Sequence, residues 1–343
     1  MVMAFDLAID VGTENVVVAA RGEGVVLREP AVVAVDASEG LPVEIGSEAL
    51  KMIESFPGSL AGYRPMAMGT VKDVKALAWM AGIVLRKCGA SKFSHPDVLI
   101  CCRPASSSIE RRAVQDAFRS SGAAGVGFLP NCVGTAAAAG IAVSDPTGVL
   151  VLDMGAGQSC ASVVSLGTVA AHDEVSVGGD GIDSAIKDLL RHSYGVVVSS
   201  RVAEEVKLAL GQAGTGDGRR RPAVEVTGRD ISRGEPVSVV VTAADVWAAA
   251  EEAVLMPAVE MIKRCLGALT PELAFDVAGR GALFAGGTSK LAGLAVRLEE
   301  ELGLEVSVMS DPQLVAVTGA GSLIGSRGRE RRLLDEIVSL YAP

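Results

Sequence analysis

The sequence has few aromatic residues, no excess of basic residues and no long apolar run. Phe, Trp and Tyr make up 3% of its 343 residues, and its formal net charge is −10. Proteins that bind nucleic acid concentrate Lys and Arg on one face, so we expect no nucleic-acid partner. No apolar stretch has the roughly 20 residues of a membrane-spanning helix, and the start, Met1–Ala8, lacks the basic region of a signal peptide. These absences predict a cytoplasmic protein.

No two cysteines have the CxxC spacing of a zinc or redox motif. Cys101 and Cys102 are adjacent in an apolar run, and a strand there would point them to opposite faces. We therefore expect buried thiols in a reducing compartment. The six cysteines are Cys88, Cys101, Cys102, Cys132, Cys160 and Cys265.

The length and the apolar content predict two α/β lobes with a cleft between them. A chain of 343 residues exceeds the size at which one hydrophobic core usually stays single. Apolar residues make up 49% of the chain, a proportion typical of packed α/β layers.

A repeated strand and turn is the most informative feature. Leu7–Val18 and Val149–Val164 each consist of an apolar strand, an Asp-x-Gly turn and a second strand, which predicts a β-hairpin. Glycines in a tight turn let backbone N–H groups converge on an anion. Asp10 and Asp153 would repel a phosphate unless a hard cation such as Mg²⁺ lay between them.

One such turn is a weak signal, because Asp and Gly are common turn residues. Two copies, each opening one half of the chain, favour duplicated domains that grip one polyphosphate from both sides.

Two further glycine loops fit the same cleft. Val177–Asp183 precedes a helix-like stretch at Ser184–His192, so it is either a phosphate or ribose contact or a plain turn capped by Asp180 or Asp183. Leu283–Leu291 passes from a strand through glycines to a helix, as an ordinary α/β connection also does. On a helix at Ala203–Leu210, Glu204 and Lys207 share one face, either as a surface ion pair or as a nucleoside contact.

The order of these motifs resembles the actin and DnaK superfamily, and within it the bacterial MreB family, over nearly the whole chain. The resemblance implies an actin-like, ribonuclease H-like α/β fold duplicated in two domains with a nucleotide cleft between them. Residues 1–145 plus 320–343 would form domain I, with a small subdomain inserted at about 30–75. Residues 146–319 would form domain II, with an insertion at about 195–255. The most similar stretches are Gly24–Ala34, Arg64–Met66, Gly69–Val71, Ile109–Ala113 and Ala203–Leu210.

The resemblance also implies ATP or ADP as ligand, with Mg²⁺ held through water by Asp10 and Asp153. The remaining residues expected to bind the nucleotide are Gly12, Thr13, Glu14, Asn15, Gly155, Ala156, Gly157, Gln158, Gly178, Gly179, Asp180, Glu204, Glu205, Val206, Lys207, Gly286, Gly287, Thr288, Ser289 and Lys290.

Members of the family assemble head to tail into filaments beneath the cytoplasmic membrane and guide cell-wall synthesis. The expected partners are therefore other copies of this chain, other actin-like proteins and membrane-bound cell-wall synthesis proteins. The candidate for a weak contact with the inner face of the membrane is the loop Ala90–Pro96, where Phe93 could enter the lipid interface beside Lys92.

Two departures from the family pattern bear on catalysis. Where the family usually reads Leu-Ile-Glu-Glu-Pro-Met, this chain has Phe128–Val133, so Pro130 and Asn131 replace the acidic residue that positions water. The usual Asp-Ile-Gly-Gly-Gly-Thr becomes Asp153–Gln158, with a methyl at Ala156 and Gln158 in place of threonine. Because phosphoryl transfer to water depends on positioning, these changes predict at most a slow ATPase, in which the amide of Asn131 or Gln158 would orient the water.

Other functions stay open. The altered loop is also compatible with a hydrolysis-deficient regulator that co-assembles with another actin-like filament. A kinase or phosphatase of the same superfamily is the other alternative, although no motif supplies its catalytic carboxylate or substrate pocket.

Overall fold

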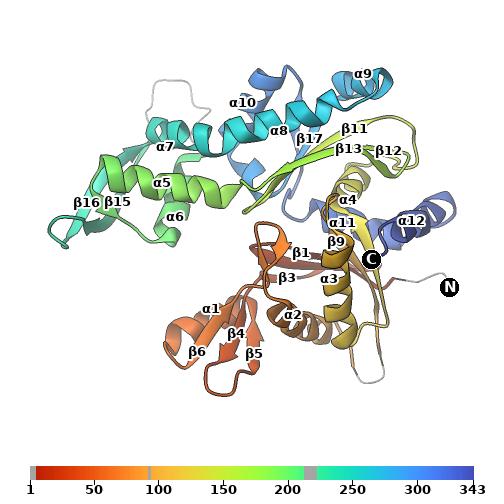
Figure 1. Cartoon of the computed structure of the whole chain (residues 1–343), viewed down its shortest axis with the longest axis horizontal. Coiled ribbons are helices and arrows are strands. Elements are labelled where there is room, and N and C mark those ends of the chain that lie inside the picture. The colour runs from red at the N-terminus through yellow and green to blue at the C-terminus, as the bar shows by residue number, and fades with distance from the viewer. Residues whose placement is uncertain (1–4, 92–93, 212–221) are drawn as a thin grey trace.

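The chain folds into two lobes, each built on a five-stranded sheet (Figure 1). The structure is a computed structural model that describes residues 5–91, 94–211 and 222–343. The sheet of lobe I has the order β10 (Gly125–Pro130), β9 (Asp97–Cys102), β1 (Leu7–Val11), β2 (Asn15–Ala20) and β3 (Gly24–Pro30). The sheet of lobe II has the order β18 (Val306–Val308), β17 (Ala282–Ala285), β11 (Val149–Met154), β12 (Ser159–Ser165) and β13 (Thr168–Val175).

The two sheets share one topology. In lobe I, β1 pairs antiparallel with β2 and parallel with β9, and β3 and β10 extend the sheet at its two edges. In lobe II, β11 pairs antiparallel with β12 and parallel with β17, and β13 and β18 take the edges. The predicted duplication and both predicted hairpins are therefore confirmed.

Helices cover both faces of each sheet, and the apolar side chains packed between helices and sheets form three large hydrophobic cores. One core lies under the helices on the outer face of lobe I, and another under those on the outer face of lobe II. The third joins the lobes, because Val17 and Val151 from the two sheets pack with Val133 and Val317. Among the helices that form these cores are α2 (Val74–Lys87), α3 (Ser108–Ser120), α4 (Asn131–Ala138), α5 (Gly179–Ser193), α8 (Met256–Gly267), α9 (Pro271–Arg280), α10 (Ala292–Leu302), α11 (Val315–Ile324) and α12 (Arg329–Leu340).

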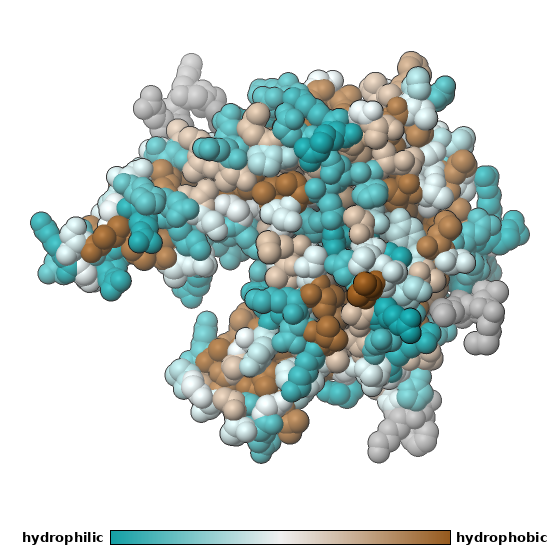
Figure 2. All heavy atoms as spheres, viewed as in Figure 1, coloured by the Kyte–Doolittle hydropathy of each residue, from teal (hydrophilic) through white to brown (hydrophobic). Residues whose placement is uncertain are grey.

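Each lobe also carries a small three-stranded sheet on the same side of the molecule, and Figure 2 shows an open notch between these two sheets. The small sheet of lobe I comprises β4 (Val33–Asp36), β5 (Pro42–Ile45) and β6 (Leu60–Tyr63) with α1 (Gly46–Ser55), followed by the hairpin β7 (Met66–Ala67) and β8 (Thr70–Val71). That of lobe II comprises β14 (Val196–Val197), β15 (Ala223–Asp230) and β16 (Pro236–Thr242) with α6 (Ser200–Gly211), α7 (Ala243–Ala250) and a π-helical turn, η2 (Glu251–Leu255). The residue borders of the domains and insertions stay a prediction.

The cysteines lie partly as expected. Cys101 belongs to the core between the lobes, whereas Cys102 packs against the outer core of lobe I, so the two thiols point to opposite faces as predicted. The expectation that all six thiols are buried is wrong, because Cys88, Cys102 and Cys160 are partly exposed. Within the described ranges, no helix combines the length and apolarity needed to cross a membrane.

The lobes meet where α4 crosses α11. A Cβ added at Gly134 would collide with the carbonyl oxygen of Ala316, and one added at Gly319 would collide with the carbonyl oxygen of Gly134. Glycine at both positions lets the two helix backbones approach more closely than any side chain allows. This crossing therefore holds the two lobes together at one point of close contact.

We expect Gly319→Ala to lower the free energy of unfolding by about 2 kcal/mol or more, because a tightly packed crossing cannot absorb an added methyl group. Gly279→Ala in α9 is the matched control, since a Cβ there meets nothing within 4 Å and alanine favours a helix by up to about 1 kcal/mol. Urea unfolding of the two variants measures the difference. Equal midpoints would show that the crossing is not tightly packed.

Candidate functional site

The two Asp-x-Gly turns have the same backbone geometry. In the first turn (Gly12–Asn15), the Gly12 N–H donates to the Asn15 carbonyl oxygen at 2.9 Å. In the second turn (Gly155–Gln158), the Gly155 N–H donates to the Gln158 carbonyl oxygen at 2.9 Å. Each aspartate therefore stands two residues before an equivalent four-residue turn, one in each lobe.

The charge of Asp153 in lobe II acts on Asp10 in lobe I. Burial raises the pKa of Asp10 to about 7, and the charge of Asp153 adds to the rise. Burial also raises the pKa of Asp153, while a hydrogen bond from Asn131 Nδ2 to Asp153 Oδ2 at 3.2 Å lowers it in part. Two carboxyls in one crowded space favour either a shared proton or a bound cation.

In the described part of the chain, one unpartnered oxygen lies beside Asp153, on Asn131, and a second lies in the second turn, on Gln158. Within the described residues, the buried atoms Asn131 Oδ1 and Gln158 Oε1 accept no hydrogen bond. Oxygens of this kind, together with Asp10 and Asp153, suit a hard cation such as Mg²⁺ that retains water ligands. No three His, Cys, Asp or Glu side chains of the described segments gather closely enough to hold a metal alone. A cation there would draw its other ligands from water and phosphate.

The second turn packs against the glycine loop that opens α5. The Gly179 N–H donates to the Gly155 carbonyl oxygen at 3.0 Å, and the Asp180 N–H donates to that of Ala156 at 2.8 Å. The predicted helix start at Ser184 and the alternative of an Asp180 or Asp183 cap are both wrong. The helix begins at Gly179, and its N-cap is Gly178, which has no side chain to donate or accept a capping hydrogen bond. Glycine is needed there because a Cβ at Gly178 would collide with Gly155.

The third glycine loop closes on the same turn. Thr288 Oγ1 in the 3₁₀ turn η3 (Gly287–Lys290) donates to the Gly155 carbonyl oxygen at 2.8 Å. A Cβ at Gly286 would lie 2.6 Å from Asp153 Oδ1, so this backbone runs directly beside the aspartate. The three predicted glycine segments of lobe II thus meet at the second turn.

The α6 residues divide between the cleft and the surface. Lys207 Nζ donates to Asp183 Oδ2 at 2.8 Å and to the Gly179 carbonyl oxygen at 3.3 Å, so of the two alternatives for Lys207 the surface pair with Glu204 is wrong. Val206 is buried in the core of lobe II, whereas Glu205 pairs with Arg201 on the surface. The structure therefore does not place Glu205 with the other predicted residues.

Charged residues of lobe II act on Glu14 in the first turn. Burial raises its pKa, Arg64 lowers it, and the charges of Asp180 and Glu204 raise it again. Arg64 Nη1 lies 3.2 Å from Glu14 Oε2 and donates to the Thr13 carbonyl oxygen at 3.3 Å. Glu14 thus faces residues of α5 and α6 across the cleft.

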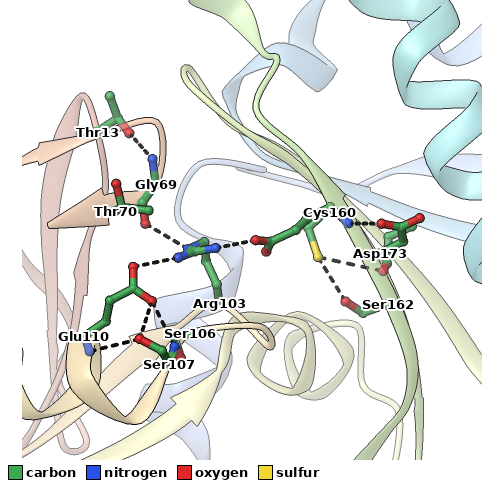
Figure 3. A network of polar contacts seen from close by, with 12 residues as sticks. Thr13, Gly69, Thr70, Arg103, Ser106, Ser107, Glu110, Cys160, Ser162 and Asp173 are labelled. Atoms are coloured by element: carbon green, nitrogen blue, oxygen red, sulfur yellow. Dashed lines mark hydrogen bonds and ion pairs between the residues drawn. The ribbon is translucent and has the colours of Figure 1, made fainter.

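Several polar residues of the site were missed by sequence reasoning. Lys290 Nζ and Arg28 Nη2 both donate to Gln313 Oε1, at 2.9 and 2.6 Å, and this contact ties lobe I to lobe II. Arg103 and Glu174 form a second tie, shown in Figure 3. Their partners are far apart in the sequence, so no local spacing could have revealed them. The missed residues are Arg28, Arg64, Arg103, Glu174, Asp183 and Gln313.

A cavity of about 360 Å³ lies elsewhere, between α3, β10 and α12. Val126, Phe128 and Val338 line it, and none of the predicted site residues does. Lys92 and Phe93, the predicted membrane contact, lie outside the described residues.

Sequence comparisons find relatives over nearly the full length. The family model described as MreB/Mbl protein matches residues 4–331. The cell shape-determining protein Mbl of Bacillus subtilis is 31% identical over 322 residues, which cover 94% of this chain and 96% of the relative. The cell shape-determining protein MreB of Escherichia coli is 33% identical over 325 residues, which cover 93% of each chain.

Structure comparisons agree. MreB5 of Spiroplasma citri bound to ADP matches with a TM-score of 0.85 at 23% identity, over 92% of this chain and 95% of that chain. The MamK double helical filament matches with a TM-score of 0.78 at 18% identity, over 94% of this chain and 99% of that chain. The predicted actin-like fold is therefore confirmed.

The raised pKa of Asp10 predicts how the free energy of unfolding depends on pH. Because the folded-state value of about 7 exceeds the usual 3.8, ionisation of Asp10 destabilises the fold as the pH rises from about 4 to 7. Without divalent cations, we expect Asp10→Asn to raise the free energy of unfolding by on the order of 2 to 4 kcal/mol at pH 8. At pH 5, where Asp10 is largely protonated, the gain is much smaller.

Thermal unfolding at the two pH values measures this difference. Asp188→Asn, which changes an exposed carboxyl on α5, is the control and is expected to show no such pH dependence. An equal gain for Asp10→Asn at both pH values would contradict the raised pKa of Asp10.

Proposed function

The chain belongs to the MreB/Mbl family, and from that premise we propose that it binds ATP with Mg²⁺ between its lobes and assembles into cytoskeletal filaments. It is an actin-like member of a family of bacterial cell shape-determining proteins. The process proposed for it is cell-shape control through cell-wall synthesis.

One observation carries the nucleotide proposal: equivalent turns from two lobes bring Asp10 and Asp153 into one crowded space. Turns of this kind suit the phosphates of a single ligand, and opposed carboxylates suit the cation that accompanies them. The ADP bound by the Spiroplasma protein and the AMPPNP bound in a second structure of it support this choice of ligand.

The residues proposed to hold Mg²⁺ through water are Asp10 and Asp153, with Asn131 Oδ1 and Gln158 Oε1 as further acceptors for the water shell. A bound Mg²⁺ would neutralise phosphate charge. The backbone of the two turns would approach the phosphates, and the loops around Gly178, Lys207 and Thr288 would form the nucleoside side of the cleft.

We propose that hydrolysis is slow. Asn131 stands at the start of α4, and its amide N–H donates to Asp153, so its free oxygen faces the site without being basic. An amide can orient a water molecule but cannot take its proton, which a carboxylate can. Asn131 is therefore the proposed water-positioning residue, and a weak one.

Self-assembly is the proposed partner interaction, and the filament formed by the structurally similar MamK supports it. A head-to-tail contact propagates into a filament instead of closing. Other actin-like proteins and membrane-bound cell-wall synthesis proteins are further proposed partners. We propose a cytoplasmic location, with the inner face of the cell membrane as the site of assembly.

The hydrolysis-deficient regulator is the second candidate, favoured by the loss of the acidic residue at Asn131.

Sedimentation tests the filament proposal. We expect the purified chain to pellet with Mg²⁺ and ATP, and Asp153→Asn to pellet less because its cation site is impaired. Assembly only after addition of a second actin-like protein would support the regulator instead. Failure of the chain to bind Mg²⁺ and ATP would refute the proposed function.

Phosphate release tests slow hydrolysis with an isosteric pair of variants. We expect Asn131→Glu to release phosphate about 10- to 100-fold faster than the parent chain, because it restores a basic group beside the water. Asn131→Gln has the same length without the charge, and we expect it to stay near the parent rate. A parent rate equal to that of Asn131→Glu would show that hydrolysis is not impaired.

A further inference from the structure

Arg103 joins three segments that are far apart in the sequence (Figure 3). It follows β9 in lobe I, and its side chain is only 15% exposed. Nε donates to the Gly69 carbonyl oxygen at 2.8 Å, Nη2 to Glu110 Oε1 at 3.0 Å and Nη1 to Glu174 Oε1 at 2.6 Å. The planar guanidinium can hold three acceptors in fixed directions, which a lysine cannot do.

The three acceptors belong to different parts of the molecule. Glu110 lies in the first turn of α3, where it forms a capping box with Ser107. Glu174 lies on β13 of lobe II, so its pair with Arg103 crosses between the lobes. Gly69 lies at the tip of the hairpin formed by β7 and β8, where Met68 and Gly69 have φ values of 48° and 71°. Two successive residues in this region give the tight turn typical of two-residue hairpins.

The Met68–Gly69 tip is wedged between the two Asp-x-Gly turns. The Gly69 N–H donates to Thr13 Oγ1 in the first turn at 3.2 Å. On the other side, a Cβ at Gly157 would lie 2.9 Å from the Met68 Cα atom. A Cβ at Gly69 would collide with Gln158 Oε1, an atom that accepts no hydrogen bond in the described structure. The tip therefore contacts both lobes at the point where the turns face each other.

The hydrogen bond from Gly69 also constrains what the Thr13 hydroxyl can do. A hydroxyl has one hydrogen to donate and two lone pairs to accept with, and the Gly69 N–H occupies one lone pair. The hydroxyl hydrogen is left to point at another acceptor, and a phosphate oxygen in the cleft is such an acceptor. Because Arg103 holds the Gly69 carbonyl, any movement of Arg103 shifts the Gly69 amide and with it the Thr13 hydroxyl.

We propose that Arg103 is a positioning residue that couples closure of the two lobes to the orientation of the Thr13 hydroxyl. When Glu174 approaches with lobe II, it fixes the guanidinium, and the guanidinium fixes the Met68–Gly69 tip against the first turn. When the lobes separate, the tip and Thr13 lose this support. The coupling rests on the proposed nucleotide site, for which it supplies a sensor of lobe closure.

Glu174→Gln and Glu110→Gln form a matched pair for testing this coupling. Both variants remove one charge that contacts Arg103, but only Glu174 lies in the other lobe. Glutamine also preserves the capping box at position 110. Arg264→Gln is a second control. It breaks the neighbouring Arg264–Asp173 ion pair, which lies within lobe II, and the Arg264 side chain is 57% exposed.

Two measurements are made on the full chain. The first is the lobe separation without nucleotide, from the distance between spectroscopic probes at the exposed residues Glu39 and Glu235, in the turns that connect β4 with β5 and β15 with β16. The probes are attached without cysteine chemistry because the chain has six cysteines. The second is the dissociation constant for ATP in the presence of Mg²⁺.

We expect Glu174→Gln and Arg103→Gln to lengthen the distance and to weaken ATP binding about tenfold, as the loss of a partly buried charge-assisted bond does. Glu110→Gln and Arg264→Gln should stay within about twofold of the parent chain. Thr13→Val, which lacks the hydroxyl, should weaken binding as well. The combination of Thr13→Val and Glu174→Gln should weaken binding less than the product of the two single effects, because both act through one hydroxyl.

Three results would overturn the coupling. These are an unchanged lobe distance in Glu174→Gln, equal effects of Glu110→Gln and Glu174→Gln, or a lengthened distance with unchanged ATP affinity. Because the distance is measured without nucleotide, it tests the tie between the lobes separately from ATP binding. A parent chain that fails to bind ATP would refute the proposed function, while an unchanged distance in Glu174→Gln would refute the coupling.

Discussion

The central constraint on the structure is that Asp10 and Asp153, one from each lobe, are buried near each other, where two negative charges without a cation repel. Burial and the charge of Asp153 raise the pKa of Asp10 to about 7, and the hydrogen bond from Asn131 lowers only the pKa of Asp153. Neither lobe creates this situation alone, because each contributes one hairpin and one carboxyl. The repeated fold is what makes the two hairpins face each other, and the α4–α11 crossing is what holds them at close range. A cation with its phosphate ligand relieves the repulsion, so ligand binding and the relative position of the lobes are physically linked.

The contacts around the aspartates follow from the same requirement for close approach. Gly178 and Gly286 carry no side chain because the backbone passes directly beside the second turn and Asp153. Gly157 and Gly69 play the same role where the Met68–Gly69 tip enters between the turns. Around this glycine-rich centre, pairs such as Lys207–Asp183 and Arg103–Glu174 hold the surrounding segments in place. The departures from the family pattern at Asn131 and Gln158 leave side-chain oxygens without hydrogen-bond partners among the described residues but supply no base, which favours binding over turnover.

The sequence predicted the elements whose information is local. The hairpins were predictable because an Asp-x-Gly turn between two apolar strands has few other conformations, and its repetition indicated the duplicated sheets. The start of α5 was not predictable, since Gly179 begins the helix only because Gly178 must pack against Gly155. The partner of Lys207 was not predictable either, because Asp183 is 24 residues away, whereas Glu204 is on the same helix. Arg103 and Glu174, 71 residues apart, gave no signal at all. Pairings created by the tertiary fold leave no spacing pattern in the chain.

Calorimetric titration of ATP near pH 7, with and without Mg²⁺, tests the opposed aspartates most directly. Buffers of different ionisation enthalpy would report the protons released. With Mg²⁺ present, we expect release of about half a proton, because Asp10 is half protonated near its pKa and must ionise beside the cation. Without Mg²⁺, binding should be much weaker. Equally tight binding in both cases, with no proton released, would show that the two carboxyls do not form a cation site.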